Sequence, residues 1–290
     1  MDIGLKEKAK KVLIVGCGDL GSRLATPLSR RGFAVSGLRR TKTDMGSNIK
    51  VLPADVTDAV SLQIVAKTSW DVVIITLTAR GEAAYHAVYI TGVSNLLAAL
   101  KQSAARPLIL FASSTSVYAQ TDGSVVDENS ETLASSYSGR TMLKAEQLVA
   151  NSGFDFSVVR FSGIYGHGRG GHLLSAMQKN QICPSQPVRY SNRIHVEDCI
   201  GIFMHLIDRY FEGKALQGIY LGSDNCPSPL REVMEWLAKV NGLDVGLLKP
   251  EFAANRGGNK RCDNRRLVSS EYQFKYPDYK SGYLAADTTE

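Results

Sequence analysis

Residues 11–21 read KVLIVGCGDLG, and this stretch decides the fold that the sequence predicts. The run Lys11–Val15 is apolar and β-branched, which is typical of a strand buried on both faces. The turn that follows has the spacing GxGxxG and opens a helical pattern. A second strand pattern, Ala34–Leu38, begins about twenty residues further on. This strand, turn, helix and strand together predict a Rossmann-type dinucleotide-binding unit.

Each glycine of the turn has a predicted role. Gly16 makes the tight turn, Gly18 lets the backbone approach a pyrophosphate, and Gly21 lets the helix pack on the strand. The helix start at Asp19 and Leu20 offers N–H groups and partial positive charge to the phosphates. The alternative is a strand–turn–helix that only needs small residues.

Strand and helix patterns alternate along most of the chain. Further strands are predicted at Lys50–Pro53, Asp71–Thr76, Leu108–Ala112 and Ser157–Phe161. Helices are predicted at Glu82–Lys101, Ser138–Asn151 and Val196–Phe211. This alternation predicts an α/β fold with a doubly wound parallel sheet.

The pattern changes after Tyr165. A loop rich in Gly, His, Arg and Gln leads to a short strand, Gly218–Leu221, and to a helix, Pro229–Val240, with Ser228 as its N-cap. We therefore predict a Rossmann domain made of residues 1–165 and about 194–212. A smaller C-terminal substrate lobe takes about 166–193 and 213–290. That lobe is expected over the carboxyl ends of the strands, where clefts in open sheets form.

The end of the second strand predicts the cofactor preference. It reads Leu38-Arg39-Arg40, where an NAD site usually has an acidic residue for the ribose hydroxyl. Two arginines suit a 2′-phosphate, so the cofactor is NADP or NAD with NADP favoured, unless the pair is an exposed basic loop. Asp55 is predicted to accept from the adenine amino group; the alternative is a helix N-cap for a segment that begins near Asp58.

Composition narrows the class of protein. The chain has 290 residues, 44% hydrophobic and 21% charged, with a net charge of +6. Its five cysteines are scattered, its five histidines have no metal-ligand spacing, and no apolar run approaches the length of a membrane span. The basic group Arg256, Lys260, Arg261, Arg265 and Arg266 is interpreted as a solvated surface loop rather than a nucleic-acid site. We expect a cytoplasmic protein with a small-molecule substrate and no metal, membrane or nucleic acid; a homodimer is one assembly that the sequence allows.

Three internal motifs resemble a known family. Phe111–Tyr118 (FASSTSVY) resembles the fifth-strand motif of extended short-chain dehydrogenases/reductases, Arg160–Arg169 (RFSGIYGHGR) their sixth-strand motif, and Arg193–Asp198 (RIHVED) their RIHVxD segment. With the glycine turn, they occur in the family's order. The C-terminal stretches YLGSDNCPSP, NKRCDNRRL and YPDYKSGYLAA resemble the YeeZ-like, atypical branch. The chain is thus identified as similar to the NAD-dependent epimerase/dehydratase family.

The resemblance implies a Rossmann fold, a bound NAD or NADP and a substrate lobe. It implies that Ser114 hydrogen-bonds the reacting oxygen, unless its hydroxyl caps the strand end. The predicted cofactor site also includes Val56, Leu77, Thr78, Ser113, Phe161 and Gly163. Candidate substrate contacts are His167, Arg169, Arg193 and His195, with a structural role for His195 as the alternative.

The family's YxxxK pair is missing. Four residues after Tyr137 comes Thr141, and in the other alignment Ser138 takes the tyrosine slot and Met142 the lysine slot. If the chain is an enzyme, we predict that Tyr137 is the proton donor and that Arg140, one turn later, supplies the positive charge. The prediction is an oxidoreductase or epimerase that acts on a hydroxyl or carbonyl of a sugar nucleotide or aldehyde. The alternative is a non-catalytic dinucleotide-binding sensor or regulator.

Overall fold

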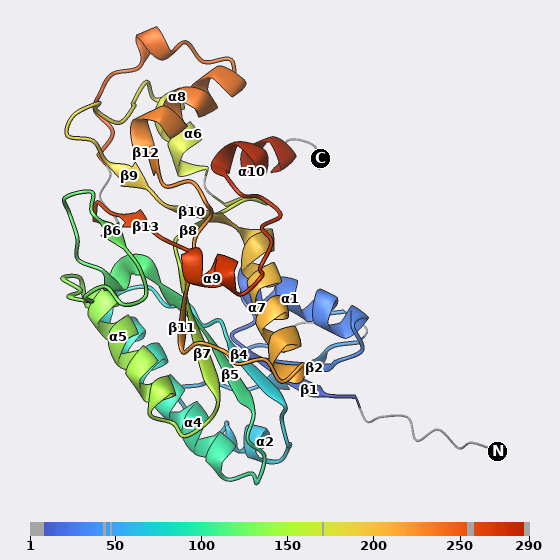
Figure 1. The fold of residues 1–290 in the computed structure, drawn as a ribbon. Coiled ribbons are helices and arrows are strands. Elements are labelled where there is room, and N and C mark those ends of the chain that lie inside the picture. Colours follow the sequence, from blue (N-terminus) through green and yellow to red (C-terminus); the bar gives the residue numbers. More distant parts are fainter. Residues whose placement is uncertain (1–8, 43–44, 47, 170, 254–257, 287–290) are drawn as a thin grey trace. The chain divides into compact units, whose positions relative to one another are not determined.

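A seven-stranded sheet organises the fold. The computed structural model describes residues 9–42, 45–46, 48–169, 171–253 and 258–286. The strands are β1 (Lys11–Val15), β2 (Ala34–Arg39), β3 (Lys50–Pro53), β4 (Val72–Ile75), β5 (Leu108–Ser114), β7 (Phe156–Phe161) and β11 (Ile219–Gly222). Their order is β11-β7-β5-β4-β1-β2-β3 (Figure 1). β1 pairs in parallel with both β2 and β4, so the winding reverses at β1. This topology is the predicted doubly wound Rossmann-type sheet.

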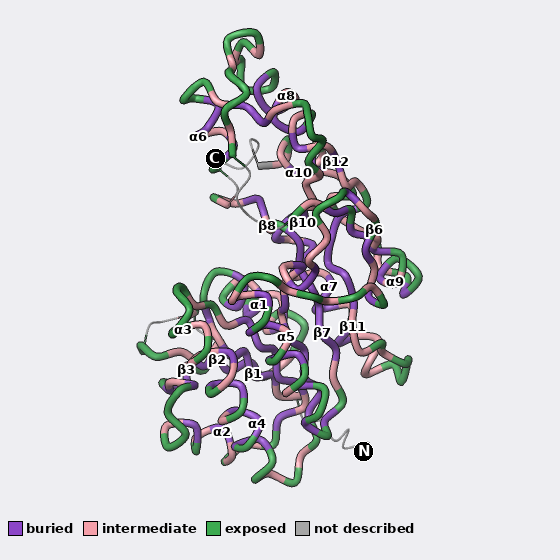
Figure 2. The backbone as a smooth tube through the Cα atoms, turned by 90° about the vertical axis from the view of Figure 1, so that its left-hand side faces the viewer, coloured by how far each residue is buried: buried purple, intermediate pink, exposed green. Residues whose placement is uncertain are grey.

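The chain divides into two compact units, of which the first is Met1–Ala112, Thr141–Val158 and Leu206–Gly218. Its helices include α1 (Asp19–Arg30), the short α2 (Gln63–Ala66), α3 (Glu82–His86) and α4 (Val93–Lys101). β1 is buried beyond its first residue (Figure 2), and all four residues of β4 are buried. Strands with no exposed face explain why these runs are continuously apolar.

The helix predicted over Glu82–Lys101 is present, but it is not a regular α-helix. Its middle, Ala87–Gly92, is a π-helical segment, η1, between α3 and α4. By length and composition, Glu82–Lys101 is apolar enough to cross a membrane, and 39% of its 18-residue apolar window is buried inside the protein. The prediction that no apolar run approaches the length of a membrane span is therefore corrected. The reason is its core-facing stripe of Leu96, Leu97 and Leu100, and a single helix of this kind is weak support for a span.

The second unit comprises Ser113–Arg140, Val159–His205 and Ile219–Glu290. It is built from short elements: η2 (Thr115–Val117), β6 (Val125–Val126), β8 (Gly163–Tyr165), α6 (His172–Gln178), β9 (Tyr190–Ser191), β10 (Arg193–His195), β12 (Ser228–Pro229), α8 (Leu230–Val240), η3 (Val245–Leu247), β13 (Arg261–Cys262), α9 (Arg265–Ser269) and α10 (Tyr279–Ala286). The longer helices α5 (Tyr137–Ala150) and α7 (Val196–Phe211) contribute residues to both units.

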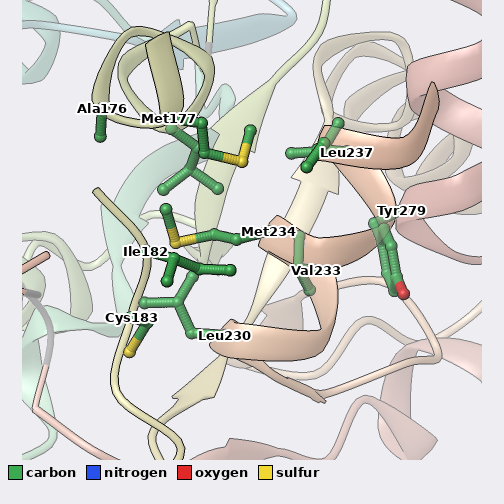
Figure 3. Close-up of a cluster of buried hydrophobic side chains, with 11 residues drawn as sticks. Ala176, Met177, Ile182, Cys183, Leu230, Val233, Met234, Leu237 and Tyr279 are labelled. Carbon is green, nitrogen blue, oxygen red and sulfur yellow. The ribbon is translucent and has the colours of Figure 1, made fainter. Parts of the chain in front are cut away.

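A separate hydrophobic core stabilises part of the second unit. Met177 and Ile182 face Met234 and Leu237 of α8 (Figure 3). α8 begins one residue later than predicted, because Ser228 and Pro229 form β12 and pair antiparallel with β9. Pro229 is therefore the N-cap of α8, in place of Ser228. The substrate lobe that the sequence predicts from residue 166 stays a prediction.

Candidate functional site

The glycine turn is held by the loop that follows β4. Gly16 has φ +95°, and a Cβ there would lie 2.9 Å from the backbone of Leu77. Thr76 Oγ1 donates to the Gly16 carbonyl at 2.8 Å. A Cβ on Gly21 would lie 2.4 Å from that same carbonyl oxygen, so only glycine lets α1 approach β1 this closely.

Gly18 has different surroundings. Among the residues that the structure describes, and apart from its own neighbours in the chain, no atom lies within 4 Å of where its Cβ would be. It is the N-cap of α1, and α1 has no side-chain cap at this end. The Asp19 carboxylate binds Arg23 at 2.6 Å, and the Leu20 side chain is buried. The predicted contact of these two residues with a phosphate would therefore come from their backbone N–H groups. An open approach to an uncapped 12-residue helix N-terminus fits a dinucleotide phosphate.

Positive charge lies beside the turn, at the end of β2. Arg39 is half-buried and Arg40 is exposed. Burial raises the pKa of Cys17 to about 11, and the charge of Arg39 acts in the opposite direction. The Cys17 thiol is therefore protonated, and Arg39 lies close enough to the turn to act on it.

The Asp55 carboxylate makes hydrogen bonds to a neighbouring residue of its own loop. Its Oδ1 accepts from the Thr57 N–H at 2.9 Å and from the Thr57 hydroxyl at 2.8 Å. The N–H bond from Thr57 is the main cause of its lowered pKa, and the charge of Arg40 contributes. Asp55 thus caps a turn; the helix-cap alternative is wrong, because α2 begins only at Gln63. The predicted contact with adenine stays a prediction.

The other cofactor residues of the first unit lie in two loops. Val56 is 5% exposed, and its carbonyl accepts from Asn95 Nδ2 at 3.1 Å. The Leu77 carbonyl accepts from the Tyr89 hydroxyl at 2.5 Å, and Thr78 is exposed. Tyr89 lies in the helix predicted over Glu82–Lys101 and is not among the predicted site residues.

Ser114 ends β5 and caps the short helix that follows. Its Oγ accepts from the Ser116 N–H at 3.1 Å, which is the strand-end alternative, and its hydroxyl keeps a proton to donate. Ser113 is 6% exposed. A Cβ on Gly139 would lie 2.4 Å from the Ser116 carbonyl oxygen. The first turn of α5 therefore packs against the turn that Ser114 caps.

That first turn carries the predicted proton donor. Tyr137 is its first residue and is half-buried. Arg140 is exposed, and its guanidinium donates to the Ser135 carbonyl before the helix. The lysine slot has no ammonium group in either alignment, because Thr141, four residues after Tyr137, is 9% exposed, and Met142, four residues after Ser138, is 3% exposed.

Two predicted cofactor residues lie where β7 ends and β8 begins. Phe161 is 3% exposed and packs edge-on against Phe203, 5.5 Å between ring centroids. Its side chain belongs to the core, and its predicted contact with the cofactor stays a prediction. Gly163 is exposed, and its N–H donates to the Asn192 carbonyl.

His195 and Arg193 are buried, which argues against direct substrate contact. His195 is 1% exposed, and its Nδ1 accepts from the Glu197 N–H at 3.2 Å. Its ring lies against Gly166, where a Cβ would come within 2.1 Å of Nε2. Arg193 is 7% exposed and donates to the Tyr283 hydroxyl at 3.1 Å. This burial favours the structural alternative for His195 and a similar role for Arg193, and their predicted substrate contacts stay predictions.

His167 and Arg169 lie in a tight turn after β8. His167 has φ +46°, and its Nε2 lies 3.2 Å from Glu197, which also binds Lys275. Arg169 is half-buried, and its N–H donates to the Gly166 carbonyl. Of the four candidate substrate residues, these two are the ones with accessible side chains.

The basic group near residue 260 is a solvated loop only in part: Lys260 is buried and Arg266 is half-buried, whereas Arg261 and Arg265 are exposed. Lys260 is 2% exposed, Arg261 donates to a backbone carbonyl, and Arg266 lies 3.6 Å from a buried glutamate. These side chains hold short elements of the second unit in place. Arg265 is exposed, and Arg256 lies outside the described residues.

Asp224 is a buried acid that no sequence motif identifies. It is 1% exposed, and burial raises its pKa to about 7, opposed by the Cys226 N–H and the charge of Arg193. Nothing in the pattern YLGSDNCPSP marks it as buried, because its burial comes from tertiary contacts.

Comparisons with known proteins agree with this geometry. A family model described as NAD(P)H-binding matches residues 16–185. Protein YeeZ of Escherichia coli strain K12 is 29% identical, and the match covers 93% of this chain and 97% of YeeZ. A Methylobacillus flagellatus protein assigned to the NAD-dependent epimerases/dehydratases is 35% identical, with a TM-score of 0.82 over 96% of this chain and 98% of its own.

A more distant match carries a cofactor. The WbmG enzyme of Bordetella bronchiseptica, solved in complex with NAD, has a TM-score of 0.80 at 15% identity, over 99% of this chain and 95% of its own. At that identity the match supports the fold alone. The glycine turn, the winding of the sheet and the family match together show that this chain belongs to the NAD(P)H-binding family, in the NAD-dependent epimerase/dehydratase group that includes YeeZ.

Proposed function

We propose that the protein is an NAD(P)-dependent oxidoreductase or epimerase that acts on a hydroxyl or carbonyl group of a small molecule. The observation that carries the proposal is the packing of Gly139 on the Ser116 carbonyl. It joins the turn capped by Ser114 to the helix turn that carries Tyr137. A hydroxyl donor and a phenol are thus supplied by neighbouring segments, as proton transfer to one oxygen requires.

In the proposed reaction, the Ser114 hydroxyl keeps its proton and donates a hydrogen bond to the reacting oxygen of the substrate. Tyr137 gives a proton to that oxygen, or takes one from it, and returns to its resting state by exchange with solvent. A bound nicotinamide ring supplies the acceptor or donor of the hydride. Gly18 and the N–H groups that open α1 hold the phosphates, and Arg39 and Arg40 favour NADP.

Buried Met142 favours a second candidate function. A short-chain dehydrogenase uses a lysine to lower the pKa of its tyrosine, and neither Thr141, four residues after Tyr137, nor the buried thioether of Met142, four residues after Ser138, carries that charge. Without that charge, the protein would bind the dinucleotide and report its redox state as a sensor or regulator. For either function we propose a cytoplasmic protein, a homodimer in assembly, with no nucleic-acid or membrane partner.

Tyr137→Phe tests the reaction. Once a screen of aldehydes, ketones and sugar nucleotides with NADPH and NADH finds turnover, the variant should lose at least about 100-fold in kcat while its Kd for NADPH stays unchanged. Ser138→Ala, which alters the alternative tyrosine slot, is the matched control and should keep normal turnover. Normal turnover by Tyr137→Phe refutes its role. No turnover in the whole screen favours the sensor.

A further inference from the structure

The helix that follows β4 contains a π-helical turn beside the glycine turn. The turn spans Ala87–Gly92, between α3 and α4. A single π turn within a longer helix widens the backbone and redirects the side chains around it, and such turns are frequent at functional sites. Here it contains Tyr89 and Gly92, and each of them faces a loop of the dinucleotide site.

Tyr89 reaches the pyrophosphate side. Its side chain is 4% exposed, and its hydroxyl donates to the Leu77 carbonyl at 2.5 Å. The backbone of Leu77 is the part of the protein that a Cβ on Gly16 would meet at 2.9 Å. One hydrogen bond therefore separates the π turn from the loop that supports the glycine turn.

Gly92 and Asn95 reach the adenosine side. A Cβ on Gly92 would lie 2.7 Å from Val56 Cγ2, so the glycine lets the helix approach Val56 closely. One turn later, Asn95 Nδ2 donates to the Val56 carbonyl at 3.1 Å. Val56 directly follows Asp55, the residue predicted to meet adenine.

We infer that this helix clamps both loops of the dinucleotide site, with Tyr89 as the positioning residue for the loop at Leu77 and Asn95 as that for the loop at Val56. The clamp fixes two loops before the ligand arrives, so that less freedom is lost on binding. The inference rests on dinucleotide binding alone, and a protein without turnover tests it equally well.

The surroundings of Tyr89 keep its hydroxyl protonated, so that it can always donate its hydrogen bond. Burial, with the nearby Tyr85 phenol, raises the pKa of Tyr89, so its hydroxyl stays protonated at any working pH. The rings of Tyr85 and Tyr89 lie 4.7 Å apart, and the Phe111 ring packs edge-on at 6.4 Å from Tyr89. Phenylalanine at position 89 would keep these ring contacts and lose the bonds of the hydroxyl to the Leu77 carbonyl and to the Tyr85 side chain.

Tyr89→Phe and Asn95→Ala test the clamp. Kd values for NADPH and NADH are measured by nicotinamide fluorescence, with the Tm of each unliganded variant. We expect each variant to bind both dinucleotides about 3- to 10-fold more weakly, the range of one lost hydrogen bond. Tyr210→Phe is the matched control, because Tyr210 donates to the side chain of Asp155 in the same unit at 3.2 Å. It should lose a similar small amount of Tm and no affinity.

Affinity relative to the control decides the outcome. If Tyr89→Phe binds both dinucleotides within twofold of the unaltered protein, the clamp is wrong and the hydrogen bond only stabilises the fold. If both single variants bind weakly and the fold-change in Kd of the double variant differs from the product of the two single fold-changes, the two contacts are coupled through the helix, as the clamp requires. Failure of the proposed reaction would leave these Kd values unaffected, so the two failures are distinguishable.

Discussion

At the scale of single residues, two glycines of one turn have opposite surroundings. Gly18 faces open space at its Cβ position, whereas Gly21 faces the Gly16 carbonyl at 2.4 Å. Gly18→Val should therefore leave the fold intact and abolish NADPH binding, because the added methyl groups occupy the approach to the pyrophosphate. Isothermal titration calorimetry measures the binding, and circular dichroism verifies the fold.

Gly21→Ala provides the contrast. Its methyl group must displace backbone, so we expect a lower Tm in addition to any loss of binding. If Gly18→Val binds NADPH with unchanged affinity, the glycine turn is not the phosphate site.

Single residues also show how far sequence reasoning reaches. The turn made by Gly16 and the close packing at Gly21 follow from local motifs and are present in the structure. The cap made by Ser114 was one of two alternatives, because a motif gives a position but not the partner of a hydroxyl. Tyr89 and Asp224 are not among the predicted site residues. The hydrogen-bond partner of Tyr89 lies 12 residues away in the sequence, and the raised pKa of Asp224 comes from burial, which only the folded structure shows.

At the scale of elements, we predict that the end of β2 sets the cofactor preference. Half-buried Arg39 is the last residue of β2, and exposed Arg40 follows it. A charge-assisted bond to a 2′-phosphate contributes about 1.5–3 kcal/mol, so NADPH should bind at least about ten-fold more tightly than NADH. Changing both arginines to alanine should erase that preference, as measured by competitive titration.

A change of net charge alone must be separated from this effect. Arg106→Ala removes an exposed arginine that donates to backbone carbonyls elsewhere in the same unit, and it should keep the preference. Equal affinity of the unaltered protein for the two dinucleotides would contradict the assignment to Arg39 and Arg40.

Elements with strong periodicity were predicted with small boundary errors. β1 and β3 have their predicted bounds, and β5 extends two residues further than expected, to Ser114. The π turn within Glu82–Lys101 was not predictable, because a stripe of apolar residues at spacings of three and four fits a regular helix equally well. Two-residue strands such as β12 have no periodicity of their own and exist only through their partners.

At the scale of the whole molecule, the sheet was predictable and the second unit was not. Motifs in a fixed order constrain a Rossmann-type sheet strongly, because each strand must be buried on both faces. The second unit is held by long-range polar contacts, such as the bond from a backbone N–H of β11 to buried Glu128. Composition cannot separate such arginines and acids from solvated ones, which is why buried Lys260 and half-buried Arg266 were not distinguished from exposed Arg261 and Arg265.

Buried Asp224 makes the stability of the protein depend on pH. Burial raises its pKa from 3.8 to about 7; the Cys226 N–H and Arg193 oppose the shift, and Asp278 and Asp198 add to it. An acid whose pKa is raised on folding binds more protons in the folded state between these two values. Its contribution to stability is therefore complete below about pH 4 and is lost as pH rises towards about 7.

Asp224→Asn should remove that dependence. Asparagine keeps an acceptor for the Cys226 N–H, which lies 3.0 Å from Oδ1, and has no charge to desolvate. Relative to the unaltered protein, the variant should gain about 2–4 kcal/mol in free energy of unfolding between pH 4 and pH 8, measured by urea denaturation. Asp263→Asn is the opposite control: the Arg265 side chain lowers the pKa of Asp263, so this variant should lose relative stability as pH rises through its low pKa. Parallel pH profiles for Asp224→Asn and the unaltered protein would show that Asp224 is ionised in the folded state from low pH onwards, with Arg193 fully compensating its burial.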